Sequence, residues 1–165
     1  MPRSGERFAD DLSAEVLFDD RLVVAAGART AWVRRRSIDL AELVDAPWIL
    51  PPPGTWYHAF VTQAFRKRGL VVPHASLVTH SIALRARILT EGTHIATFAD
   101  SVVRLNTDHY ALAVLPVDLS DQPLPAGILT LKNRTLSPIV GPFISIARAV
   151  ASSFAREALH TPAHS

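Results

Sequence analysis

The feature that most constrains this chain is a regular alternation of short apolar runs with longer amphipathic runs across residues 47–115. The short runs are bounded by Gly, Pro and Ser, as strands are, while the longer runs repeat apolar residues three and four apart, as helices do. This alternation predicts an α/β fold with a mainly parallel sheet covered by helices. The expected strands are 47–50, 74–79, 93–98 and 110–115, and the expected helices are 56–68, 82–90 and 100–105.

Further elements are expected on both sides of this region. Strands are expected at 15–18, 21–26 and 127–132, with Asp19-Asp20 between the first two. A short helix is expected at 39–44, capped by Ser37 or Asp39, and a long helix begins at Ser137-Pro138. Serine is a common N-cap and proline a common first residue of a helix. The apolar residues expected on one face of the long helix are Phe143, Ile146, Ala147, Val150 and Phe154.

Helices 56–68 and 82–90 each contain several apolar residues. Helix 56–68 is expected to face the core with Phe60 and Ala64, with Phe65 as a further candidate, and to end at Gly69. The apolar residues of helix 82–90 are Ile82, Leu84, Ile88 and Leu89. Trp48 is expected in the core, whereas Trp56 fits the core and the wall of a cleft about equally well.

In parallel α/β sheets, ligands bind beyond the carboxyl ends of the strands, where the N-termini of helices point inward. The expected alternation contains three such junctions, at residues 51–56, 79–82 and 98–101. They are predicted to be walls of one cleft.

Composition excludes several classes of protein. Hydrophobic residues make up 48% of the chain, enough for a core, and the net charge is only +2, so no concentrated basic face for DNA is expected. The absence of cysteine excludes disulfides and thiolate chemistry. The first twelve residues are polar, and no apolar run approaches the roughly 18 residues of a membrane span. A cytoplasmic protein without membrane contact is therefore expected.

Common catalytic motifs do not occur. The sequence has no glycine-rich dinucleotide or phosphate loop, no Gly-x-Ser-x-Gly elbow and no His-Glu-x-x-His pair. His80 and His94 could approach each other at strand ends, but a metal site needs a third ligand. The run Arg34-Arg35-Arg36 is interpreted as a solvated loop. No enzymatic activity, metal or cofactor is expected.

One region is more specific. Residues 39–55, which read DLAELVDAPWILPPPGT, resemble the start of the second lobe in LysR-type transcriptional regulators. The resemblance continues in order through AFRKRGL at 64–70, VTHS at 78–81, GTHIATFADSVV at 92–103, LAVLPV at 112–117, GILTLK at 127–132 and LSP at 136–138. The proline loop and the LSP junction are most similar to the branch with regulators of galactose uptake and protocatechuate catabolism.

The resemblance implies a fold like type 2 periplasmic binding proteins, with one complete lobe and remnants of a second lobe joined by two crossing strands. It implies a small-molecule effector-sensing domain that lacks the helix-turn-helix of a full regulator. The implied division is a tail 1–13, a first crossing region 14–26, a second lobe 27–126, a second crossing strand 127–134, a helix of the first lobe 135–159 and a tail 160–165.

The resemblance also implies the ligand site. The residues expected to contact an effector are Pro52, Pro53, Gly54, Thr55, Thr79, His80, Ser81, Thr97 and Phe98. The effector is expected to be an aromatic acid, a sugar or a sugar acid. Turn and capping roles explain the Gly, Pro, Ser and Thr residues of this set equally well.

A second interpretation stays open. A chain with only part of one lobe would expose the apolar face of its last helix, and such a face favours a protein partner. On this alternative the chain is an interaction protein that pairs with itself or with intact regulators and has no ligand function.

Overall fold

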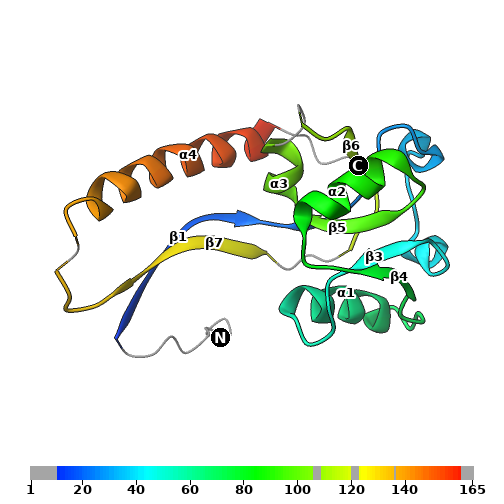
Figure 1. Cartoon of the computed structure of the whole chain (residues 1–165), viewed down its shortest axis with the longest axis horizontal. Coiled ribbons are helices and arrows are strands. Elements are labelled where there is room, and N and C mark those ends of the chain that lie inside the picture. Colours follow the sequence, from blue (N-terminus) through cyan, green and yellow to red (C-terminus); the bar gives the residue numbers. More distant parts are fainter. Residues whose placement is uncertain (1–10, 106–108, 120–122, 136, 161–165) are drawn as a thin grey trace. The chain divides into compact units, whose positions relative to one another are not determined.

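The computed structural model describes residues 11–105, 109–119, 123–135 and 137–160, with side chains as far as residue 152. The chain forms two compact units. We call Arg21–Pro123 the sheet unit, and we call the described parts of Met1–Asp20 and Leu124–Ser165 the ribbon unit. Figure 1 labels the helices and strands of both units.

A five-stranded sheet forms the centre of the sheet unit, in the order β4-β3-β5-β2-β6. Strand β3 pairs in parallel with β4 and with β5, whereas β2 pairs antiparallel with both β5 and β6. Four strands therefore run in one direction, and β2 lies reversed among them. The strands are β2 (Leu22–Gly27), β3 (Trp48–Leu50), β4 (Ala75–Val78), β5 (Ile95–Ala99) and β6 (Leu112–Val114).

Helices cover both faces of this sheet, and each face has its own apolar cluster. Helix α1 (Trp56–Lys67) packs on one face together with the short 3-10 helix η2 (Leu40–Leu43). Helices α2 (Ile82–Glu91) and α3 (Asp100–Leu105) pack on the other face, as Figure 1 shows. A second 3-10 helix, η1 (Ala31–Arg34), follows β2.

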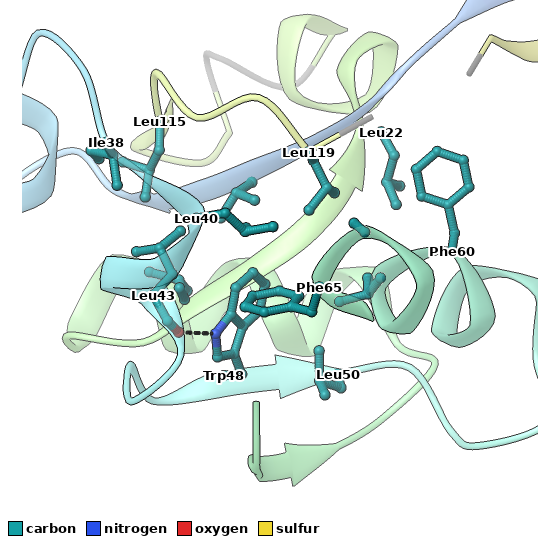
Figure 2. Packing of buried hydrophobic residues seen from close by; sticks show 14 of the residues in the cluster. Leu22, Ile38, Leu40, Leu43, Trp48, Leu50, Phe60, Phe65, Leu115 and Leu119 are labelled. Atoms are coloured by element: carbon teal, nitrogen blue, oxygen red, sulfur yellow. Dashed lines mark hydrogen bonds between the residues drawn. The ribbon is translucent and has the colours of Figure 1, made fainter. Parts of the chain in front are cut away.

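Trp48 is the largest fully buried side chain of the first cluster. Its indole Nε1 donates a 2.7 Å hydrogen bond to the carbonyl oxygen of Leu43, and its ring meets the Phe65 ring edge-on at 5.9 Å (Figure 2). The hydrogen bond satisfies two buried polar groups at once. The predictions that Trp48, Phe60, Ala64 and Phe65 lie in the core are confirmed.

Local sequence explains where these elements start and stop. The prolines after Leu50 cannot donate to a sheet, so β3 ends there. Asp39 caps η2 in a reciprocal capping box with Glu42. Gly69 follows α1 with φ of 68°, a left-handed conformation that suits glycine.

The ribbon unit contains two antiparallel strands and one helix. Strand β1 (Leu12–Asp20) pairs with β7 (Leu124–Leu131), with an irregularity between Val16 and Phe18. Helix α4 (Val140–His160) packs along β1. An ion pair joins Arg148 of α4 to Glu15 of β1.

Helix α4 packs on the ribbon with one apolar stripe and leaves another in solvent. Val140, Ile144 and Ala147 are partly buried, and Ala151 is buried. The exposed stripe contains Ile139, Phe143, Ile146 and Val150, which are 50–75% exposed. We call these four residues the α4 stripe. Ala147, predicted on the same face as Phe143 and Ile146, is more buried than those two, and the side chain of Phe154 lies outside the described residues.

Two local predictions were wrong, and α2 shows a burial pattern that was not predicted. Helix α4 begins at Val140, because Ser137 and Pro138 form a turn in which the Ser137 carbonyl accepts from Val140 N–H. Asp19 and Asp20 lie inside β1, because their backbones pair with Pro125 and Leu124. Helix α2 buries Arg85, Ala86 and Leu89, while Ile82 and Leu84 are about 45% exposed.

Candidate functional site

The three predicted junctions lie along one edge of the sheet unit. Strands β4, β3 and β5 are neighbours and run parallel, so their carboxyl ends at Val78, Leu50 and Ala99 face the same way. The Thr79 N–H donates to the Leu50 carbonyl oxygen at 3.1 Å and ties the second junction to the first. We call this the carboxyl edge.

The first junction forms a tight turn into α1. Gly54 has φ of 83°, in the left-handed region that a residue with a side chain rarely adopts. The Thr55 hydroxyl donates to the Pro52 carbonyl at 2.7 Å and accepts from His58 N–H at 3.2 Å. Pro53 and Gly54 are exposed, and Thr55 is partly buried. These contacts fix the start of α1 and hold the loop in one shape.

The second junction precedes α2. The Thr79 hydroxyl accepts from Ser81 N–H at 3.1 Å, and the Ser81 hydroxyl accepts from Leu84 N–H at 3.2 Å. His80, between them, is exposed. The hydroxyl groups therefore perform the turn and capping roles that their positions allow.

Thr97 and Phe98 lie within β5 and are almost fully buried. The Thr97 hydroxyl has no hydrogen-bond partner. The guanidinium of Arg85 lies over the Phe98 ring, 4.9 Å from its centroid. Both residues belong to the layer beneath the junctions, and the surface of the carboxyl edge is formed by the loops and helix ends.

Arg85 is a residue that the sequence analysis missed. It is only 9% exposed, its Nη1 donates to the Thr97 carbonyl at 2.6 Å, and its Nε has no partner. Burial lowers the pKa of Arg85 and the Tyr57 phenol opposes that shift. A signal was present, because Arg85 is four residues before the buried Leu89 and thus lies on the inner face of α2.

Asp100 is the acidic residue that directly follows β5 at this edge. It is 6% exposed, and its Oδ2 accepts from Arg21 Nε and Arg104 Nη2, each at 2.9 Å. Two cations thus compensate one buried carboxylate. The arrangement anchors the start of α3 to the start of β2.

Aromatic side chains stand at the start of α1. Trp56 is 49% exposed and Tyr57 43% exposed, and their rings meet edge-on at 5.2 Å. Trp56 also lies 5.2 Å from the Phe60 ring. Trp56 therefore does not lie in the core, and its place in the wall of a cleft stays a prediction.

Two hollows of the sheet unit lie at the opposite edge. One, of about 440 Å³, is lined by residues that include Gly27, Arg29 and Thr93. The other, of about 390 Å³, is lined by residues that include Pro47 and His74. Both adjoin the amino ends of β3, β4 or β5, and none of the predicted site residues lines either one.

Within the described ranges, no group of three or more His, Cys, Asp or Glu side chains could hold a metal ion. The same part of the chain contains no helix with the length and hydropathy needed to cross a bilayer.

Residues 3–152 match the family described as the LysR substrate binding domain, and the chain belongs to this family. It is 28% identical over 127 residues to the HTH-type transcriptional regulator GbpR of Azospirillum brasilense, an alignment that covers 77% of this chain. The chain spans 37% of the length of that relative.

Solved structures show the same fold. The CcmR regulatory domain of Synechocystis PCC6803 in complex with 2-PG superposes with a TM-score of 0.70 at 20% identity, covering 88% of this chain and 70% of that one. The effector binding domain of QuiR in complex with shikimate gives 0.66 at 17% identity, covering 90% and 69%. The prediction of a type 2 periplasmic-binding-protein-like fold, with one lobe and remnants of another, is confirmed.

Proposed function

We propose that this chain is the small-molecule effector-sensing domain of a LysR-type bacterial transcriptional regulator in the cytoplasm. The observation that carries the proposal is the meeting of three strand-to-helix junctions at the carboxyl edge. Thr55 and Thr79 stand there at loops whose shape is already fixed by hydrogen bonds. A rigid edge lowers the entropic cost of binding.

The proposed ligand contacts are Pro52, Pro53, Gly54, Thr55, Thr79, His80 and Ser81, with Thr97 and Phe98 beneath them. The exposed rings of Trp56 and Tyr57 beside Thr55 favour a ligand with an apolar or ring-shaped part. Threonine and serine hydroxyls favour a ligand with hydroxyl or carboxylate groups. An aromatic acid, a sugar or a sugar acid combines these properties, and the similarity to domains in complex with shikimate and 2-PG supports a small-molecule ligand.

On this proposal a separate helix-turn-helix of the regulator, and not this domain, contacts DNA. We propose that residues 14–26 and 127–134 are the crossing strands, that 27–126 form the second lobe and that 135–159 belong to the first lobe. The tails 1–13 and 160–165 are assigned no role. The effector changes the populations of two arrangements of the lobes, and this change alters how the helix-turn-helix binds DNA.

Ligand titration tests the proposal. Benzoate, shikimate, galactose and gluconate are added to the chain while its melting temperature is measured, and hits are mapped by backbone amide NMR. The expected result is a rise in melting temperature with one class and shifts of amide signals around Thr55 and Thr79. Amide shifts confined to the hollow beside Gly27 contradict the proposed site, and no response at millimolar ligand contradicts a sensing role.

The α4 stripe favours a second candidate function, pairing with another chain. Three apolar side chains of α4, together with Ile139 just before it, recur four, three and four residues apart and are all exposed. On this candidate the chain pairs with a second copy or with an intact regulator. Light scattering coupled to size exclusion separates the candidates, because a monomer that binds ligand contradicts pairing as the main role.

A further inference from the structure

We propose that Arg85 recognises an anionic group of the effector, a carboxylate or a phosphate. The inference rests on the proposed function, since it needs a ligand at the carboxyl edge. It adds the chemical class of that ligand and a specificity-determining residue.

The position of Arg85 is the first argument. It lies in the first turn of α2, which starts at the second junction. Its Nη1 donates to the carbonyl of Thr97, one residue beyond Ala96, where the pairing of β5 with β3 ends. The guanidinium therefore lies at the level of Thr97, two residues before β5 ends at the carboxyl edge.

The charge of Arg85 is the second argument. Ion pairs with carboxylates join Arg21, Arg35, Arg68, Arg87, Arg104 and Arg148 to their partners. Arg85 is only 9% exposed, yet it has no ion-pair partner among the described residues. Asp100, at the same edge, is already bound by two other guanidinium groups.

The groups that face Arg85 do not neutralise it. The Phe98 ring lies against its guanidinium and the Thr97 carbonyl accepts one hydrogen bond. Tyr57 acts on it from α1, and Glu91 on its own helix is paired with Arg87. A buried cation with one hydrogen bond and a ring contact is costly, because it has lost water without gaining a counter-charge.

An anionic ligand would supply the missing charge. The guanidinium has five donors in a planar fork and binds carboxylate or phosphate with two parallel hydrogen bonds. The Nε of Arg85 is buried and has no partner, so the guanidinium keeps an unused hydrogen-bond donor. The N-termini of α1 and α2 at the same edge add a favourable potential for negative charge.

Pairs of probes that are similar in structure but differ in charge, with a salt control for phosphate, test the proposal on the full chain. The pairs are benzoate with benzyl alcohol, gluconate with glucose, and inorganic phosphate with sodium chloride at equal ionic strength. The expected result is a rise in melting temperature with the anionic member of at least one pair and none with its neutral or chloride partner. Stabilisation by neutral members alone overturns the inference and leaves the proposed function standing, whereas no response to any probe overturns both.

Variants separate recognition from a structural role. Arg85→Met should weaken the binding of the active anion by about tenfold or more, Arg85→Lys should weaken it less, and Arg87→Met, on the exposed side of α2, should leave it unchanged. Without ligand, Arg85→Met should match or exceed the melting temperature of the wild type, because it removes an unpaired buried charge. If Arg85→Met instead lowers stability and binds the anion like the wild type, Arg85 only ties α2 to β5 and the proposal fails.

Discussion

Arg148 on α4 donates hydrogen bonds from Nε and Nη2, both 2.8 Å long, to the two carboxylate oxygens of Glu15 on β1, 133 residues earlier in the chain. This two-point contact fixes both the position and the rotation of α4 along the ribbon. On the same helix, Ile144 and Ala147 are partly buried and the α4 stripe is exposed.

Glu15→Gln should make the stability of the chain less dependent on pH. The hydrogen bonds from Arg148 lower the pKa of Glu15 below its ordinary value of 4.5. Because the pKa is lower in the folded state, the contact stabilises the fold above pH 4.5, and this stabilisation is lost as the pH falls through the folded-state pKa. Urea unfolding at pH 7 and pH 3 measures the effect. The variant should be less stable than the wild type at pH 7, and the difference in stability between the two should be smaller at pH 3.

Arg148→Gln and the double variant complete the Glu15 test as a mutant cycle. If Glu15→Gln has the same effect in the Arg148→Gln background as in the wild type, the two residues are not coupled.

Trp48→Phe should destabilise the sheet unit. The change leaves the buried Leu43 carbonyl without its donor and removes part of the largest buried ring. Loss of the hydrogen bond alone costs about 1–3 kcal/mol. Denaturant unfolding followed by circular dichroism measures the loss. Trp56→Phe is the matched control, and because Trp56 is half exposed its effect on stability should be within about 0.5 kcal/mol.

Gly27→Ala should destabilise the chain through a steric clash. A β-carbon at Gly27 would overlap the backbone carbonyl of Leu89 in α2, and a helix backbone cannot move aside as a flexible side chain can. Overpacking of this kind costs about 1–3 kcal/mol. Gly141→Ala is the control, since a β-carbon there meets no atom within 4 Å. Equal melting temperatures for the two variants would contradict the close packing of β2 against α2.

Phe143→Ser combined with Ile146→Ser should reduce self-association without lowering stability. Both side chains are about 65% exposed in the α4 stripe, so little packing is lost when they are shortened. Light scattering of the wild type should give a mass above the 18.0 kDa of one chain, and the double variant should return to that value. A monomeric wild type at high concentration would show that the stripe alone does not drive pairing.

Local chemistry predicted much of this fold. The three prolines after Leu50, the cap at Asp39 and the glycine at position 69 act through their own backbone geometry, so their effects can be read without a partner. The alternation of strands and helices predicted the parallel part of the sheet, because a helix between two successive strands brings the second strand back in the same direction. Because parallel strands have their carboxyl ends on the same side, the sequence also predicted that the junctions meet at the carboxyl edge.

Other features depend on distant residues, and the sequence did not predict them. The place of β2 between β5 and β6 is set by pairing with strands far along the chain. Leu84 of α2 is apolar yet exposed, while the neighbouring Arg85 is buried. The side of the helix on which each residue lies, and not its hydrophobicity, determines its burial here. The contact of Arg85 with Phe98 requires two elements to be packed before it exists.

The reversed strand β2 also governs the order in which the sheet unit can assemble during translation. β2 leaves the ribosome before β5 and β6, yet Val24 and Ala25 become fully buried only when both of those strands flank it. Strands β3, β4 and β5, with their helices, can pair first through short-range contacts, which close at a lower entropic cost. A nascent chain halted after β5 should therefore hold β2 at an open sheet edge, with the hydrogen-bonding groups that later pair with β6 still unpaired.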